Sequence, residues 1–157
     1  MTPGINVARK AKVVHSVHAY AHDPASTSYG LEAAEKLGVP AARVFKTLVV
    51  CLDGRELAVG VVPVSAMLGM KQIARAAGAR KAAMAAPHEV ERATGYVLGG
   101  VSPLGQKKRL RTFIDASAEA FAAIYVSAGR RGLEIELNPQ DLKALTGGAF
   151  AELCRIG

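Results

Sequence analysis

Apolar and polar residues follow two patterns along the chain, and each pattern predicts one type of element. Alternation of apolar and polar residues, or a short apolar run, is typical of strands, whereas an apolar repeat every three to four residues is typical of helices. These patterns predict strands at 13–20, 44–52, 56–62, 81–85, 111–116, 123–127, 133–137 and 149–154. Capping residues and glycine stops predict helices at 3–12, 30–37, 70–77, 87–94 and 139–145.

Two tight turns decide the expected fold class. Asp53-Gly54 is a hairpin signal between the second and third strands, and the turn at 129–132 joins the sixth strand to the seventh. These hairpins break the regular alternation of strands and helices that a doubly wound sheet needs. We therefore expect an α+β fold in a single domain over residues 1–157.

Lys46 is the one charged residue in the apolar run at 44–52. Alternate residues of a strand share a face, so Lys46 should lie with Val44, Leu48 and Val50. A lysine removed from water costs free energy unless it has a partner or an anionic ligand. Two interpretations stay open at this point: Lys46 guards the edge of a sheet against aggregation, or it points into a polar pocket.

A glycine-rich segment at 99–105 has no regular period and predicts a loop. Adjacent glycines let backbone N–H groups approach a ligand closely, and Pro103 stiffens the loop. The fitting ligands are a carbonyl oxygen that develops negative charge or a phosphate, and the alternative is a plain tight connection. The ending of a P-loop is missing, so that motif is excluded.

The net charge of +7 and the pI near 9.7 favour an anionic partner, and nucleic acid is the obvious candidate. Basic residues gather directly after the glycine loop and in the turn at 129–132. The alternative for each cluster is a solvated surface. The candidates for RNA binding are Lys107, Lys108, Arg109, Arg130 and Arg131.

Several other classes of protein fit poorly. No apolar stretch is long enough to span a membrane, and the N-terminus has no signal-peptide pattern, so a cytoplasmic location is expected. Cys51 and Cys154 are expected to be reduced core thiols. His15, His18 and His22 fall on a predicted strand and loop, which separates them, so neither a metal nor another cofactor is expected.

Five blocks together resemble the YbaK family of trans-editing deacylases, in the order of that family and over nearly the whole chain. The subgroup most closely resembled is the Cys-tRNA(Pro) deacylases, which are related to the editing insertion domain of bacterial prolyl-tRNA synthetases. The blocks are HDP at 22–24, TSYGLEAA at 27–34, RVFKTLV at 43–49, GGVSPLGQKK at 99–108 and SAGRRGLEIEL at 127–137.

The resemblance implies a mixed β-barrel-like sheet flanked by helices, and hydrolysis of the ester that joins cysteine to the 3′ end of tRNA(Pro). Lys46 matches the family lysine that holds the tRNA end, and Gly99 and Pro103 match a Gly-x-x-x-Pro loop. Family members often carry Phe at position 29 and Asp at position 134. We expect Lys46, Gly99, Gly100 and Val101 to carry catalysis, and Tyr20, Tyr29, Thr47, Ser102, Pro103, Ser127 and Glu134 to bind substrate.

The expected mechanism relies on the substrate, because the chain shows no obvious nucleophile, base or metal site. The thiol of the bound cysteine would attack its own ester, helped by effective molarity and by an oxyanion hole of backbone amides at 99–101. Attack by water, which would tolerate alanine, is an alternative mechanism. A deacylase for another mischarged tRNA, such as Ala-tRNA(Pro), is an alternative function. A non-catalytic tRNA- or synthetase-binding module is another. The expected partners are tRNA and prolyl-tRNA synthetase.

Overall fold

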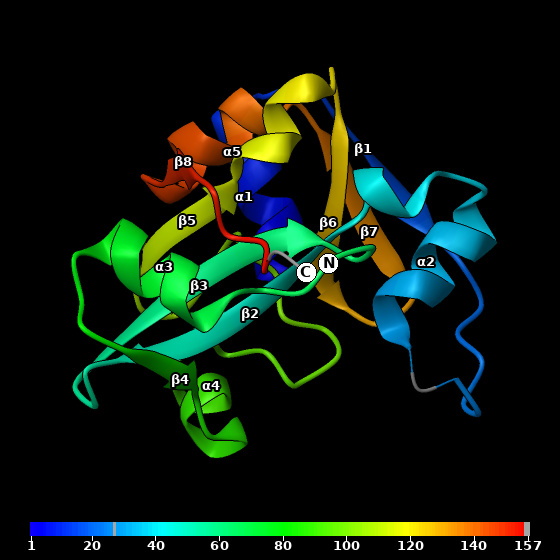
Figure 1. Cartoon of the computed structure of the whole chain (residues 1–157). Coiled ribbons are helices and arrows are strands. Elements are labelled where there is room, and N and C mark those ends of the chain that lie inside the picture. The colour runs from blue at the N-terminus through cyan, green and yellow to red at the C-terminus, as the bar shows by residue number, and fades with distance from the viewer. Residues whose placement is uncertain (27, 156–157) are drawn as a thin grey trace.

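The computed structural model describes residues 1–26 and 28–155, and its elements follow the predicted order (Figure 1). The helices are α1 Pro3–Ala11, α2 Tyr29–Leu37, α3 Met70–Ala77, α4 Pro87–Thr94 and α5 Pro139–Thr146, with 3₁₀ turns at Ala41–Arg43 and Ala116–Ala120. The strands are β1 His15–Ala19, β2 Phe45–Leu52, β3 Glu56–Pro63, β4 Ala82–Met84, β5 Arg111–Asp115, β6 Ile124–Arg130, β7 Leu133–Leu137 and β8 Ala149–Ala151.

The strands form two sheets, and the predicted α+β class is confirmed. The smaller sheet has the order β1-β7-β6 and is antiparallel, while the larger sheet has the order β4-β2-β3-β5-β8 and is mixed. The sheets meet just before β2, where Val44 forms a parallel bridge with Tyr125 of β6. The mixed sheet expected from the resemblance is therefore two hydrogen-bonded sheets joined at this bridge.

A shared core holds the two sheets together. Phe45 and Val59 from the larger sheet, Ile124 and Ile135 from the smaller one, and Leu142 of α5 belong to one buried cluster. Burying apolar side chains of this size stabilises the fold by about 1.5–3 kcal/mol each relative to exposing them. The core therefore fixes how the start of β2 faces β6 and β7.

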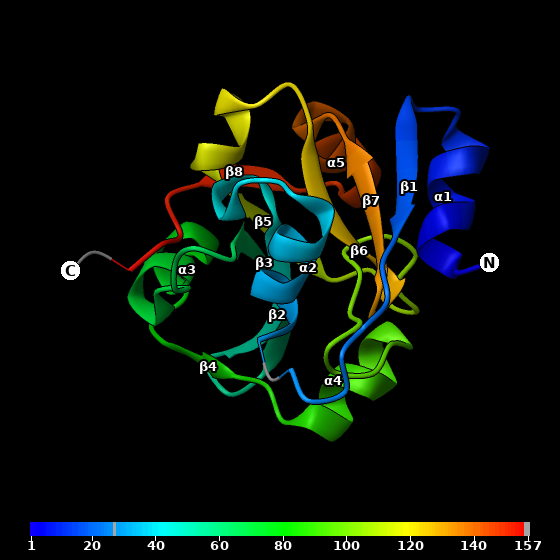
Figure 2. The ribbon, with the colours of Figure 1, turned by 90° about the vertical axis from the view of Figure 1, so that its right-hand side faces the viewer.

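Helix α2 covers the junction of the sheets, as Figure 2 shows. Ala33 and Ala34 of α2 pack in one cluster with Val44, Val64 and Tyr125, so the helix contacts both sides of the bridge. Small side chains on this face allow the helix to lie close to the strands.

Helix ends were predicted well because they depend on local chemistry. The side chain of Thr2 accepts a hydrogen bond from the Ile5 amide at the start of α1, and Asn138 caps α5 in the same way through the Gln140 amide. Gly78 ends α3 in the left-handed conformation, with φ of 73°.

The strands differ more from the prediction. β8 ends at Ala151, short of the predicted 154, because the Leu153 amide donates to the Asp115 carboxylate and Cys154 forms only an isolated bridge with Leu68. β6 runs beyond the predicted 127 to Arg130, because a bulge between Ser127 and Arg130 lets the pairing with β7 continue.

We expect Asn138→Ala to lower the free energy of unfolding by about 1 kcal/mol, because the side chain at this helix start accepts the Gln140 N–H at 2.7 Å. Urea unfolding followed by circular dichroism measures the change. Gln140→Ala is the matched control because it keeps the capping bond. An equal loss in both variants would contradict the assigned cap.

Candidate functional site

A cavity of about 470 Å³ opens at the junction of the two sheets. Its walls come from the start of β2, the segment after β3, the glycine loop, the start of α2, and the strands β6 and β7. The lining residues are Tyr20, Ser28, Tyr29, Gly30, Leu31, Val44, Phe45, Lys46, Thr47, Leu48, Val64, Ser65, Ala66, Met67, Leu98, Gly99, Val101, Ser127, Arg131 and Glu134.

Lys46 lies in the wall of this cavity, near the start of β2 and paired in register with Val62. Its side chain is half-buried, and burial lowers the pKa of its ammonium group. Within the described part of the chain Lys46 makes no salt bridge, and the Cys154 thiol partly opposes the lowering of its pKa by burial. Of the two interpretations left open by the sequence, this placement favours the polar pocket.

Two buried side-chain atoms lack hydrogen-bond partners in the described residues, and both belong to residues that line the cavity. They are Thr47 Oγ1 and Arg131 Nε. Buried polar groups in folded proteins are nearly always bonded, and the exceptions often mark a site that a ligand or water completes. The two atoms therefore indicate where polar groups of a ligand can bind.

Gly99 and Val101 of the glycine loop line the cavity, whereas Gly100 does not. Gly99 has a φ of 90°, and a Cβ there would lie 2.9 Å from the Tyr29 ring, so the position needs glycine. The Gly100 amide donates to Val97 O at 3.0 Å and is thereby occupied. This corrects the expected set of three donors to the amides of Gly99 and Val101, which donate to no described residue.

Ser102 and Pro103, which were expected to bind substrate, do not line this cavity. Ser102 is fully buried, and its Oγ accepts the Leu104 amide at 3.2 Å. Pro103 lines a separate cavity of about 290 Å³, together with Lys108 and Arg109. The loop turns back at Ser102, which the run of residue types does not reveal.

Arg131 was predicted on the RNA-binding surface, but it lies in the cavity wall. Its guanidinium carbon sits 3.5 Å from the centre of the Tyr29 ring, and its Nη2 donates to Ser26 O at 3.2 Å. Stacked cation–π contacts of this kind order both side chains. Lys107, Lys108, Arg109 and Arg130 are exposed, as an RNA-facing surface requires.

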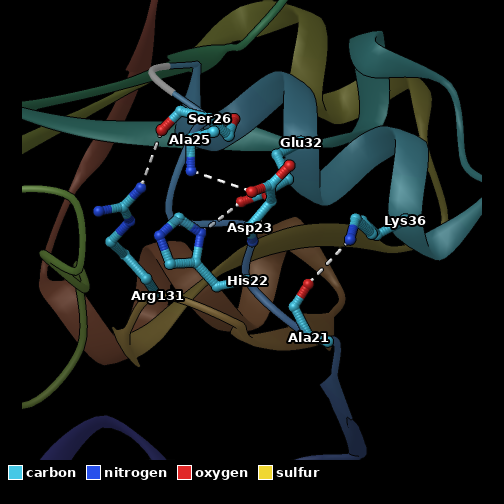
Figure 3. Close-up of polar contacts among 8 residues, drawn as sticks. All are labelled: Ala21, His22, Asp23, Ala25, Ser26, Glu32, Lys36 and Arg131. Atoms are coloured by element: carbon cyan, nitrogen blue, oxygen red, sulfur yellow. Dashed lines mark hydrogen bonds and ion pairs between the residues drawn. The ribbon is translucent and has the colours of Figure 1, made fainter.

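The residues before α2 are held by a hydrogen-bonded cluster that sequence reasoning missed (Figure 3). His22 Nδ1 lies 2.7 Å from Glu32 Oε1, and the Asp23 amide donates to Glu32 Oε2 at 2.8 Å. The bonds from His22 and Asp23 lower the pKa of Glu32, which is buried. Lys36 Nζ donates to Ala21 O at 2.9 Å. The cluster thus fixes the cavity wall that carries Tyr29.

Glu134 of β7 lines the cavity and is 6% exposed. In the sheet, Glu134 is paired in register with His18 of β1 and with Ser127 of β6. Burial raises the pKa of its carboxyl to about 8, and its charge contributes, after burial, to a raised pKa of Tyr20. Its side chain forms no hydrogen bond with a described residue. The sequence placed Glu134 in the pocket, but it did not reveal this isolation.

The three histidines near the N-terminus lie apart, each in its own contact. His15 Nδ1 is 2.8 Å from Val13 O, His18 Nε2 is 2.9 Å from Glu136, and His22 faces Glu32. Over 1–26 and 28–155 no group of three or more His, Cys, Asp or Glu is placed to hold a metal ion. None of the helices in these ranges is long and apolar enough to cross a membrane.

The chain is similar to a known protein family and to two of its relatives. The model of the aminoacyl-tRNA editing domain matches residues 22–145. EbsC of Enterococcus faecalis, a proposed Cys-tRNA(Pro)/Cys-tRNA(Cys) deacylase, is 42% identical over 120 residues, which are 76% of the chain and 73% of EbsC. YwhH of Bacillus subtilis, an uncharacterised protein, is 32% identical over 111 residues, which are 71% of the chain and 70% of YwhH.

A solved structure shares the fold over its full length. The crystal structure of a proposed trans-editing enzyme for prolyl-tRNA synthetase superposes with a TM-score of 0.83 at 25% identity, covering 99% of each chain.

We expect Glu32→Gln to loosen the wall before α2, because it removes the carboxylate that His22 and the Asp23 amide share. Hydrogen exchange at the Asp23 amide should accelerate several-fold. Since the folded pKa of Glu32 is lowered, its stabilising contribution is present above its ordinary pKa of 4.5 and is lost as the pH falls through the folded value. Thermal unfolding measured from neutral pH to below pH 4.5 should show the loss of this stabilisation in wild type and not in Glu32→Gln.

Glu35→Gln is the control, because Glu35 is exposed on the same helix. If both variants exchange and unfold like wild type, the carboxylate does not hold the wall.

Proposed function

The chain belongs to the aminoacyl-tRNA editing domain family, as its motifs predict, and from this premise we propose that it removes cysteine from mischarged Cys-tRNA(Pro). It is an aminoacyl-tRNA deacylase by family. The cysteine substrate is supported by the similarity to EbsC, which covers three quarters of the chain. The observation that carries the proposal is one cavity that brings Lys46 and the glycine loop together.

Lys46 binds the 3′ end of the tRNA in this proposal. Its half-buried ammonium has no carboxylate partner in the described residues, and Lys46 lines a cavity of about 470 Å³. A phosphate at the mouth of the cavity would supply the missing negative charge. A charge-assisted bond of this kind contributes about 1.5–3 kcal/mol.

The thiol of the bound cysteine acts as the nucleophile. Its sulfur, after losing a proton to solvent, forms a bond to the ester carbonyl carbon, and the bond from that carbon to the tRNA 3′ oxygen breaks. The 3′ oxygen takes up a proton from water, and a β-thiolactone leaves the site to be hydrolysed to cysteine. The cavity contributes by holding sulfur and carbonyl carbon at attacking distance.

The glycine loop stabilises the tetrahedral intermediate. The amides of Gly99 and Val101 bond to no described residue and belong to residues of the cavity wall, so they are the donors available for the oxyanion. Thr47 Oγ1, buried without a partner, supplies a further polar contact for the substrate. Strong stabilisation is needed because closing a four-membered ring is strained.

The remaining contacts concern the body of the tRNA and the synthetase. The exposed side chains Lys107, Lys108, Arg109 and Arg130 bind the phosphate backbone. In this proposal tRNA(Pro) is selected through a complex with prolyl-tRNA synthetase, because phosphate contacts carry no information on base identity. Both partners are cytoplasmic, and we place the protein there.

We expect Lys46→Ala to lower kcat/KM for Cys-tRNA(Pro) by roughly 10- to 150-fold, because the substrate's phosphate loses its cation and a bond of about 1.5–3 kcal/mol. Deacylation of radiolabelled Cys-tRNA(Pro) measures the effect, and Ala-tRNA(Pro) and Ser-tRNA(Pro) should react slowly with wild type. Lys71→Ala is the control, since Lys71 is exposed on α3.

Each alternative gives its own result in this assay. Rapid loss of alanine would replace thiol attack with attack by water. Binding of all three tRNAs without turnover would make the protein a binding module.

We expect the isolated protein to deacylate Cys-tRNA(Pro) and Cys-tRNA(Cys) at similar rates, because its specificity for the tRNA comes from the synthetase. Adding prolyl-tRNA synthetase should favour Cys-tRNA(Pro). Affinity for either tRNA should fall steeply with salt, since several phosphates are contacted. Strong discrimination by the isolated protein, or a flat salt response, would contradict this assignment.

A further inference from the structure

Glu134 is a buried acid that the proposed chemistry leaves unused. It is 6% exposed, lines the cavity, and is bonded to no described residue. Its strand neighbour Ser127 already accepts the Gly129 amide at 3.1 Å. Burying a carboxyl without a partner is costly, and such groups are usually bonded. No described residue supplies a partner for Glu134, and its carboxyl lines the cavity, so a donor that enters with the substrate can bond to it.

Lys46 does not serve as that partner. The two residues line the same cavity, yet no salt bridge joins them, and neither contributes to the pKa shift of the other. Lys46 lies instead near Cys154, while Glu134 lies near Tyr20. The cavity thus has a cationic site at Lys46 and an acidic site at Glu134, and neither side chain forms a salt bridge with a described residue.

An aminoacyl ester carries groups that match both sites. Its terminal nucleotide brings phosphate, and its amino acid brings an α-ammonium group with three N–H donors. The α-ammonium is the cation common to every aminoacyl-tRNA whatever its side chain. A carboxylate inside a water-poor cavity is the acceptor that such a group prefers.

We propose that Glu134 binds the free α-ammonium group of the aminoacyl ester and that the site thereby rejects esters whose amine is blocked by an acyl group. This inference rests on the proposed function and specifies its substrate class. With phosphate held at Lys46 and ammonium at Glu134, the ester between them is oriented toward the glycine loop. Peptidyl and N-formylated esters lack the cation and leave Glu134 without its partner.

Binding should release a proton. Burial raises the pKa of Glu134 to about 8, so the carboxyl is mostly protonated at pH 7 and ionises when the ammonium binds. Several ionisable groups lie around Glu134. They are His18 of β1, Tyr20 directly after β1, Glu32 of α2, Arg131 after β6, and Lys46 of β2. β6 places Ser127 opposite, which does not titrate.

The test uses two stable amide analogues, 3′-cysteinylamino-3′-deoxyadenosine 5′-phosphate and its N-acetyl derivative, with isothermal titration calorimetry at pH 7 in two buffers of different ionisation enthalpy. Wild type should bind the free amine about 10- to 100-fold more tightly and release up to one proton. Glu134→Gln should bind both analogues equally and release none. Glu134→Asp should keep part of the preference.

Glu136→Gln is the matched control, because it removes a carboxylate two residues away that contacts His18 and does not line the cavity. It should keep the preference of wild type. Equal binding of both analogues by wild type, or an unchanged preference in Glu134→Gln, would overturn the inference.

Deacylation assays distinguish the amine-binding role of Glu134 from the deacylase activity itself. Wild type should deacylate Cys-tRNA(Pro) but leave N-acetyl-Cys-tRNA(Pro) intact, and equal cleavage of both would reject the role of Glu134 alone. If neither ester is cleaved but the analogue preference depends on Glu134, the amine site stands and the deacylase proposal fails.

Discussion

The bridge between Val44 and Tyr125 is the contact on which the site depends, because it joins two sheets that otherwise have separate hydrogen-bond networks. It brings the start of β2 against β6 and so places Lys46 in one cavity with Ser127 and Glu134. Helix α2 packs over the bridge and positions Tyr29 above the same space. Without this junction, the candidate residues would lie on unconnected surfaces.

The cavity concentrates polar groups whose bonds are incomplete. Lys46 and Glu134 lack counter-charges, and Thr47 Oγ1 and Arg131 Nε lack partners among the described residues. Such a site costs folding free energy, which the shared core and the His22–Glu32 contact offset. A ligand that brings an anion at one end and a cation at the other relieves the cost, which is why an aminoacylated nucleotide fits.

Sequence reasoning succeeded where structure depends on neighbours in the chain. The end of α3 at Gly78 and the hairpin at Asp53-Gly54 follow from local conformational preferences. Lys46 was singled out because one charge in an apolar strand demands an explanation. The motif order then identified the family, which the match to residues 22–145 confirms.

The sequence was less informative where contacts join distant segments. Arg131 stacks on Tyr29 and bonds to Ser26 across the cavity, and no local pattern distinguishes it from the exposed Arg130. The turn of the glycine loop likewise removes Ser102 from the cavity and occupies the Gly100 amide. These positions depend on how the loop packs against β6, which residue types alone do not specify.

In the proposed reaction, the ester bound in this cavity is cleaved by the substrate's own thiol. The most direct test compares deacylation rates of Cys-tRNA(Pro) and 2-aminobutyryl-tRNA(Pro), whose side chain matches cysteine in shape but has a methyl group in place of the thiol. If the thiol is the nucleophile, the cysteinyl ester should be cleaved at least about 100-fold faster. Equal rates for the two esters would contradict it.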